Sequence, residues 1–112
     1  MTMFKLISGG NTNLTQIKPT AGTIYDIEAW TVNAGVRFLK LYDSLAQPTV
    51  GQTKTAAVYA IPGSAAGGRF EKSFIRGLAF ANGIWMALTV NPGDGDSAAV
   101  GANDHGVNID FS

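Results

Sequence analysis

The chain has 112 residues, with eight basic side chains, eight acidic side chains and no cysteine. This length predicts a single domain, residues 1–112, and the lack of cysteine excludes disulfide bonds and thiolate metal sites. A formal net charge of zero excludes the broad positive field that attracts nucleic acid, so we expect no nucleic-acid partner.

The surface is expected to carry little charge. Only 14% of the residues are charged, whereas 46% are hydrophobic. This is a low charge for a small soluble domain, and it suits contact with other protein. No apolar run reaches the length of about 18 residues that a membrane span needs, so we expect no membrane partner. The apolar start, Met1–Ile7, is too short for a signal peptide.

The charges are distributed unevenly along the chain. Six of the eight basic residues lie between Arg37 and Arg76, and four aspartates follow after residue 90 with no further lysine or arginine. One interpretation is that these charges lie on solvated loops and faces. The other is that two oppositely charged surfaces meet between copies in an oligomer.

Segments with a period of two begin early in the chain. Met3–Ile7 is a candidate first strand, and a loop follows it. Thr23–Val32 is rich in β-branched and aromatic residues, which favour strands. Its alternation places Tyr25, Ile27 and Ala29 on one face and Ile24, Asp26, Glu28 and Trp30 on the other. The two acidic side chains indicate that the second face meets water or a partner.

The middle of the chain contains three more candidate strands. Val36–Tyr42 has apolar side chains on both faces, so we expect it to be bulged or covered on both sides. After a long loop, Asp43–Thr53, the segment Lys54–Ile61 alternates between small and apolar residues. The flexible segment Pro62–Gly68 separates it from Arg69–Ile75, which alternates again.

Asn82 and Gly83 separate two apolar runs, Leu78–Ala81 and Ile84–Val90. A two-residue type I′ turn needs a positive φ at both central positions, and Asn-Gly tolerates this best. The sequence therefore predicts an antiparallel hairpin. Because the second run is the most apolar in the chain, we place it in the centre of a sheet.

The end of the chain combines a long loop with a final strand. Asn91–Asp104 is rich in Gly, Asp and Ala, and loops of this length are usually functional or mobile. Gly106–Phe111 then places Val107, Ile109 and Phe111 on one face, as in a strand with one wet face. Seven or eight short strands without a convincing helix predict an all-β fold, an antiparallel sandwich or barrel.

His105 is the only histidine in the chain, and it lies next to Asp104. A general base needs a partner and a substrate within hydrogen-bond reach, and neighbours in a strand point to opposite faces. We therefore interpret His105 as a histidine at the edge of the loop. An enzyme would need His105 and carboxylates to converge in one pocket. One histidine without cysteine gives no typical zinc site.

Three further patterns are weak signals of chemistry. Asp94 and Asp96 resemble the start of a calcium loop, but the closing bidentate Glu is missing. Asp26 and Glu28 share one strand face, whereas a glycosidase pair normally comes from separate elements. The glycines of Pro62–Gly68 lack the lysine and the helix of a phosphate-binding loop. We expect no catalytic residue, no cofactor and no metal.

The aromatic residues allow two binding interpretations. Trp30 and Tyr42, with Arg37 and Lys40, could form a stacking platform for a nucleic-acid strand, which the zero net charge disfavours. Trp30 and Trp85 could instead stack on sugar rings. Trp85 lies in the most apolar run, so we expect it in the core, whereas the position of Trp30 stays open.

Three segments form a further pattern: Val-Arg-Phe-Leu-Lys-Leu-Tyr at 36–42, Gln-Pro-Thr-Val-Gly at 47–51, and Gly-Leu-Ala-Phe-Ala-Asn-Gly-Ile-Trp-Met-Ala-Leu-Thr at 77–89. Together they resemble small structural proteins of tailed bacteriophages, of the capsid decoration (cement) kind. The resemblance spans roughly Ala21 to Val90 and the closing strand, and its motifs are packing patterns. It implies a jelly-roll-like β-sandwich that assembles as a homo-oligomer, commonly a trimer, on the major capsid shell. It offers no catalytic residue and no counterpart for Asn91–Asp104.

We therefore expect an accessory virion protein that is made in the host cytoplasm and binds the capsid surface. Its expected partners are the major capsid protein and further copies of itself. The residues expected to make these contacts are Trp30, Arg37, Leu39, Lys40, Arg69, Asp94 and Asp96. The alternative is a carbohydrate- or receptor-binding β-sandwich module of a phage tail or fibre, which predicts exposed aromatic residues along a groove.

Overall fold

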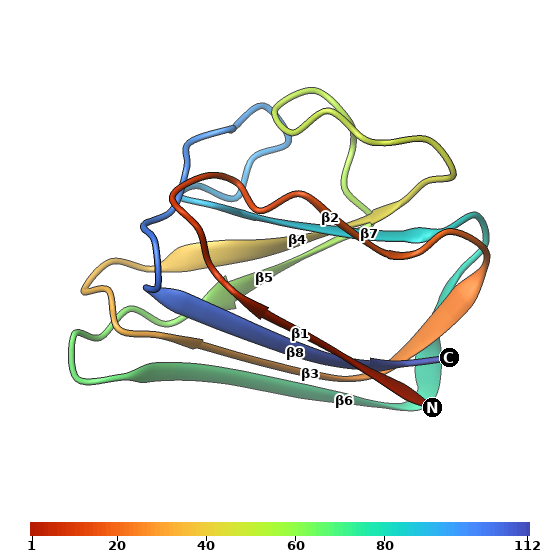
Figure 1. Ribbon diagram of the computed structural model, residues 1–112, viewed down its shortest axis with the longest axis horizontal. Coiled ribbons are helices and arrows are strands. Elements are labelled where there is room, and N and C mark those ends of the chain that lie inside the picture. The colour runs from red at the N-terminus through yellow and green to blue at the C-terminus, as the bar shows by residue number, and fades with distance from the viewer.

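The computed structural model describes residues 1–112 and contains eight strands and no helix. The strands form two four-stranded antiparallel sheets that pack face to face (Figure 1), so the predicted all-β sandwich is confirmed. One sheet has the order β1-β8-β3-β6 and the other the order β2-β7-β4-β5. The strands are β1 (Thr2–Ile7), β2 (Thr15–Lys18), β3 (Gly22–Thr31), β4 (Arg37–Asp43), β5 (Ala57–Ile61), β6 (Gly68–Phe80), β7 (Ile84–Thr89) and β8 (His105–Phe111).

The strand order is that of an eight-stranded jelly roll. The antiparallel pairs β1–β8, β2–β7, β3–β6 and β4–β5 are the four rungs of one long hairpin that wraps around the core. Every connection except that between β4 and β5 therefore passes from one sheet to the other. This topology is the one that the phage resemblance implied.

A core of 13 buried residues fills the space between the sheets. Strands β3 to β8 supply most of it, through alternating residues such as Leu39 and Leu41 from β4 and Val107 and Ile109 from β8. Strands β1 and β2 pack only partly buried side chains against it. Burying a side chain of this size contributes about 1.5–3 kcal/mol relative to leaving it exposed. The predicted core face of β8 is confirmed, and β4 is covered on both sides, which was one of the two expectations for it. β7 lies between two partners in its sheet, as its apolar sequence predicts.

The predicted hairpin at Asn82-Gly83 is wrong. This turn joins β6 to β7, which lie in different sheets, and neither Asn82 nor Gly83 has a positive φ. The Asp43 carboxylate holds the turn by accepting hydrogen bonds from the backbone N–H groups of Ala81 at 3.0 Å and Asn82 at 2.8 Å. Glycine is needed at 83 because a Cβ there would lie 2.6 Å from the carbonyl oxygen of Ser44.

A bulge divides β6, which the sequence pattern predicts as two separate segments. Asp26 pairs with Ser73 and Ile24 pairs with Leu78, so Tyr25 alone lies opposite residues 74–77 of β6. The bulge also shifts the alternation of β3. Ile24 is therefore buried in the core and does not share the outer face with Asp26, which corrects the predicted face.

One short strand, β2, was not predicted from the sequence. It pairs with β7 and shifts register between Gln16 and Lys18, so it has too few regular residues to show a period of two. The structure contains no helix long and apolar enough for a membrane crossing.

Candidate interaction surfaces

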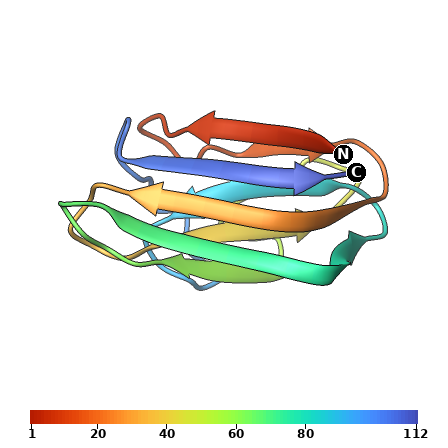
Figure 2. The same cartoon turned by 90° about the horizontal axis from the view of Figure 1, so that it is seen from below.

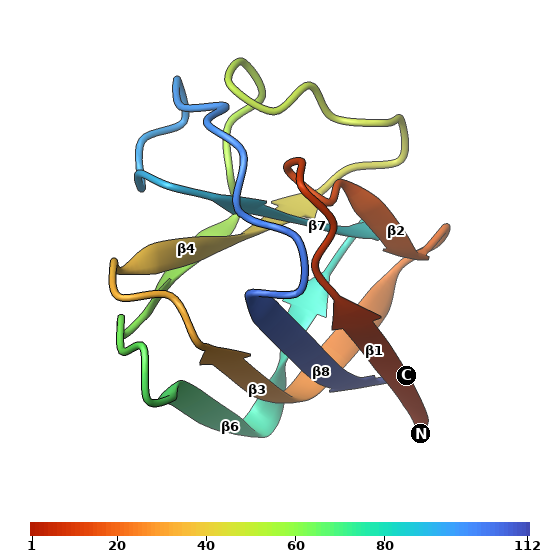
Figure 3. The ribbon, with the colours of Figure 1, turned by 60° about the vertical axis from the view of Figure 1, so that its left-hand side comes forward.

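The outer faces of the two sheets differ in how they are covered. Two long loops, residues 44–56 and 90–104, lie over the outer side of the sheet β2-β7-β4-β5 (Figures 1 and 3). No loop crosses the outer side of the sheet β1-β8-β3-β6, onto which Figure 2 looks directly. We call this uncovered side the open face.

The open face consists of three rows of side chains, each running across four paired strands. The registers place residues of β1, β8, β3 and β6 side by side in every row. In that strand order the rows are Ile7–Gly106–Trp30–Arg69, Lys5–Asn108–Glu28–Glu71 and Met3–Asp110–Asp26–Ser73.

The middle row contains two glutamates directly opposite each other. Glu28 of β3 pairs with Glu71 of β6, and like charges in this arrangement destabilise a sheet. Arg69 offsets the repulsion because its guanidinium forms ion pairs with Glu28, at 2.7 Å, and with Glu71. Hydrogen bonding to Glu28 and the charges of both carboxylates raise the pKa of Arg69. Arg69 therefore offsets one of the two negative charges of this pair and binds both carboxylates.

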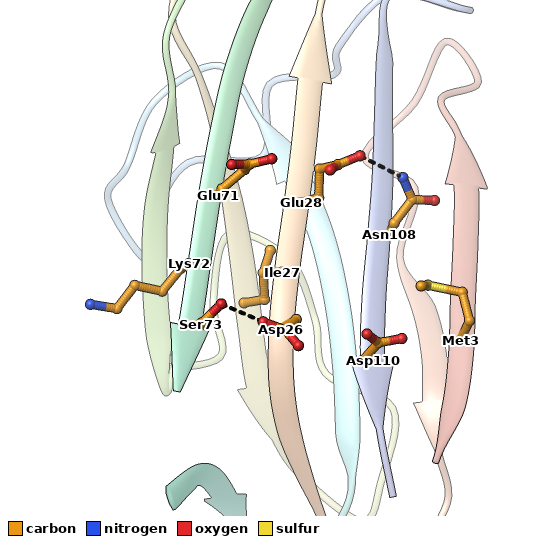
Figure 4. A pocket seen from close by; sticks show the side chains of 9 residues that line it. All are labelled: Met3, Asp26, Ile27, Glu28, Glu71, Lys72, Ser73, Asn108 and Asp110. Carbon is orange, nitrogen blue, oxygen red and sulfur yellow. Dashed lines mark hydrogen bonds between the residues drawn. The ribbon is translucent and has the colours of Figure 1, made fainter. Parts of the chain in front are cut away.

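The row nearest the chain ends contains a second like-charge pair, Asp26 and Asp110. The Ser73 hydroxyl donates a hydrogen bond to Asp26, but no lysine or arginine forms an ion pair with either aspartate. A hollow of about 340 Å³ lies between this row and the row with Asn108, Glu28 and Glu71 (Figure 4). Its lining residues are Met3, Asp26, Ile27, Glu28, Glu71, Lys72, Ser73, Asn108 and Asp110. We call the row with Met3, Asp110, Asp26 and Ser73 the acidic end.

Apart from Arg69, the opposite end of the open face is apolar. Trp30 is half-buried, and a Cβ at Gly106 would clash with its indole ring, so the ring lies directly on the glycine backbone. Ile7 is 47% exposed in the same row. The open face therefore combines a mainly apolar end, a middle row whose glutamates are ion-paired to Arg69, and an acidic end.

The covered face contains a fully buried lysine, Lys40. Its Nζ donates hydrogen bonds to the carbonyl oxygens of Gly93 at 2.6 Å and Asp96 at 3.0 Å. Burial lowers the pKa of Lys40, while the charges of Asp96 and Asp94 act in the opposite direction. The loop that resembled a calcium site thus surrounds an ammonium group of the chain itself.

The carboxylates of the same loop bind donors of the chain. Asp94 accepts hydrogen bonds from the hydroxyl of Thr55 at 2.8 Å and from its backbone N–H at 3.2 Å. Asp96 accepts one from the backbone N–H of Asn91 at 3.1 Å. These bonds lower the pKa of Asp94 and Asp96, against the effect of desolvation. No group of three or more metal-ligating side chains is assembled in the structure.

The structure corrects two of the predicted contact residues. Leu39 belongs to the core and Lys40 lies beneath the loop, and both are fully buried, so neither is available to a partner. Arg37 is half-buried and donates a hydrogen bond to the carbonyl of Val36 at 2.9 Å. The contacts proposed for Trp30, Arg37, Arg69, Asp94 and Asp96 stay predictions.

Trp85 is also placed differently from the expectation. It lies on the covered face of β7, directly opposite Tyr42 of β4, and is only half-buried. It is therefore not part of the core between the sheets. The Tyr42 hydroxyl and the Trp85 Nε1 are both buried without a hydrogen-bond partner.

His105 directly follows the loop, as predicted, but it is the first residue of β8 and is fully buried. Its Nε2 lies 3.0 Å from the hydroxyl of Thr31, and its Nδ1 has no partner. Burial lowers its pKa. His105 shares the inward side of β8 with Val107 and Ile109, so it does not converge with the carboxylates of the open face.

Alternation predicts that Asp26 and Glu28 point outward, but it does not reveal the residues that join them. Glu71 and Asp110 come from β6 and β8, and only the strand order brings them beside β3.

Comparison of the chain with models of protein families, with curated proteins and with solved structures finds no match.

Proposed function

We propose that this chain is an accessory virion structural protein that binds and stabilises a capsid shell as a homo-oligomer. The observation that carries the proposal is the contrast between the two outer faces. One is covered by the chain's own loops, whereas the other presents three complete rows of side chains without any cover. Such a face suits a large contact with another protein.

The composition of the open face supports this proposal. Directly opposed acidic pairs reduce the stability of an isolated sheet, but they provide charge complementarity to a partner. Exposed apolar side chains lie at both ends, with Ile7 in one outer row and Met3, which is 58% exposed, in the other. Jelly rolls occur in viral capsid domains and in lectins, but a fold does not by itself determine a function.

The partners follow from the phage resemblance. It implies the major capsid protein as the binding surface and an oligomer, commonly a trimer, as the binding unit. A closed oligomer presents the same face several times, so that contacts which are weak singly become strong together.

The proposal is tested with capsid shells of the phage that encodes this chain, assembled without it. The purified chain is expected to co-sediment with the shells at a fixed stoichiometry and to raise the temperature at which they disassemble. Arg69→Glu adds a third acidic side chain to the Glu28–Glu71 pair and is expected to weaken this binding by about tenfold or more.

Lys54→Glu is the matched control, because it makes the same change of charge on an exposed loop of the covered face. Circular dichroism establishes that both variants fold. Shells that neither bind the chain nor gain stability from it would overturn the proposal.

A second candidate function is favoured by Trp30. Its half-exposed indole lies one row from Glu28 and Asn108, which hydrogen-bond each other at 3.4 Å, and sugar sites combine such aromatic and polar groups. In a Trp85→Phe variant, Trp30 is the only tryptophan. A shift of its emission with one member of a glycan panel would support a carbohydrate-binding module, and unchanged emission across the panel would exclude it.

A further inference from the structure

The bulge of β6 forms a protrusion at the edge of the open face. It consists of Ile75, whose side chain is fully exposed, and Arg76, which is exposed and forms no ion pair. Gly77 next to them has φ +79°, a conformation that glycine adopts without strain. We call Ile75 and Arg76 the β6 protrusion.

The position of the protrusion separates it from ordinary exposed residues. It lies on β6, which is an edge strand of its sheet, and the bulge interrupts the pairing of β6 with β3. A bulged edge is a poor template for adding another strand. A contact made here therefore uses side chains, with an apolar group and a guanidinium side by side.

The acidic end has the complementary chemistry. Asp26 and Asp110 are opposed to each other without a cation, and the exposed side chain of Met3 lies beside Asp110. Within the same sheet, Arg69 shows how a guanidinium resolves such a pair, because it binds both Glu28 and Glu71. No arginine or lysine of the same chain does this for Asp26 and Asp110.

The open face does not suit stacking on itself. Its rows contain the acidic residues Asp26, Glu28, Glu71 and Asp110 against only two basic ones, Lys5 and Arg69. The chain as a whole has no net charge, so the positive charge that balances this excess lies elsewhere on the same molecule. Two exposed basic residues of β6, Lys72 and Arg76, form no ion pair. Lys72 lies over the ring of Phe74 on its own strand, whereas Arg76 has no such contact.

We propose that the β6 protrusion of one copy binds the acidic end of a second copy of this chain. In this contact the Arg76 guanidinium lies between the carboxylates of Asp26 and Asp110, and Ile75 packs against Met3. The proposal rests on the homo-oligomer in the proposed function and adds to it the surfaces through which the copies meet.

Charge reversal tests the contact in the purified full-length chain, by sedimentation equilibrium at low salt. Arg76→Glu and Asp110→Lys, each alone, are expected to weaken self-association by about tenfold or more. The chain that carries both changes is expected to recover self-association, because a glutamate then meets a lysine. Lys54→Glu repeats the charge change of Arg76→Glu at a distant loop and is expected to leave self-association unchanged.

Several results would overturn the inference. They are a wild-type chain that stays monomeric at millimolar concentration, an Arg76→Glu variant that associates like the wild type, and a double variant that does not recover. A monomer that still binds and stabilises shells would overturn the contact between copies but not the virion function. Association through Arg76 without any binding to shells would overturn the virion function but not the contact between copies.

Discussion

Lys40 shows how a charged residue stabilises a loop from inside. Its ammonium group connects β4 to the backbone carbonyls of Gly93 and Asp96, in a loop that has no regular structure. A hydrogen bond to a charged group contributes about 1.5–3 kcal/mol. Burying the charge costs desolvation energy, so the buried ammonium group needs both hydrogen bonds to offset that cost.

Replacing Lys40 by methionine tests this function of the side chain. Lys40→Met keeps most of the apolar stem but removes both donors, so we expect a loss of about 1–3 kcal/mol in the free energy of unfolding, measured with urea. The amide of Asp96, which donates to the Gly93 carbonyl, is expected to exchange hydrogen faster. Lys54→Met on the exposed loop is the control. Equal unfolding midpoints for Lys40→Met and the wild type would contradict the prediction.

His105 makes stability depend on pH. Because burial lowers its pKa in the folded chain, the unfolded chain binds a proton more readily below its ordinary pKa of about 6.5. The free energy of unfolding is therefore expected to fall as the pH drops from about 7.5 through about 6.5 to about 5. Asp104 opposes this pKa shift and Arg37 adds to it. In His105→Gln, which cannot titrate, we expect a flatter profile over the same range, measured by urea unfolding at each pH.

The local sequence around His105 could not reveal its burial. The residue follows a polar loop, and its backbone N–H and C=O groups both bond to Ser8, 97 positions away. The outward direction of Asp26 and Glu28 was predictable, because it follows from alternation within one strand. Their neighbours Glu71 and Asp110 were not, since strand order is a property of the whole chain.

At the scale of elements, alternation predicted most strands, whereas turn chemistry predicted a turn but not the pairing of its strands. A period of two located β3, β5 and β8, because each has one side against the core. β4 shows no such period, because it is buried on both sides. It failed at Ile24, where a bulge changes the side on which a residue points. Asn82-Gly83 was correctly recognised as a turn, but the partner of each adjoining strand is set by the wrapping of the whole hairpin. A local motif does not contain that information.

The turn at Gly83 gives an element-scale prediction. Gly83→Ala would bring a Cβ to 2.6 Å from the Ser44 carbonyl and 3.2 Å from that of Lys18, so the β6–β7 connection must shift. We expect a loss of about 1–3 kcal/mol in the free energy of unfolding, as for other overpacked sites. Gly95→Ala is the control, because a Cβ at that position would have no atom within 4 Å and the φ of Gly95 is not positive. Equal stability of the two variants would contradict this explanation of the turn.

For the whole molecule, the jelly roll couples the chain ends to each other. β1 pairs with β8, so residues about one hundred positions apart must meet before the sheet β1-β8-β3-β6 is complete. Contacts of such long range cannot be read from local sequence, and they make folding slow, in milliseconds to seconds. Both sheets also share one core, so that neither buries its apolar side without the other.

The shared core leads to the last prediction, that the two sheets unfold together. Trp30 lies on β3 and Trp85 on β7, so Trp85→Phe and Trp30→Phe each leave one fluorescent reporter, in opposite sheets. In each background we expect the urea midpoint from fluorescence to coincide with that from circular dichroism. Leu88→Ala removes a buried core side chain of β7 and is expected to cost about 2–5 kcal/mol.

The decisive comparison is the response of Trp30, which lies in the sheet that does not contain Leu88. If the core joins the sheets into one cooperative unit, Leu88→Ala must lower the midpoint reported by Trp30 as much as that reported by circular dichroism in the same background. If only the Trp85 signal moved, the sheets would be separate units. The sheet that carries the open face would then stay folded after the opposite sheet and its loops unfold, and the alignment of its rows would not depend on the shared core.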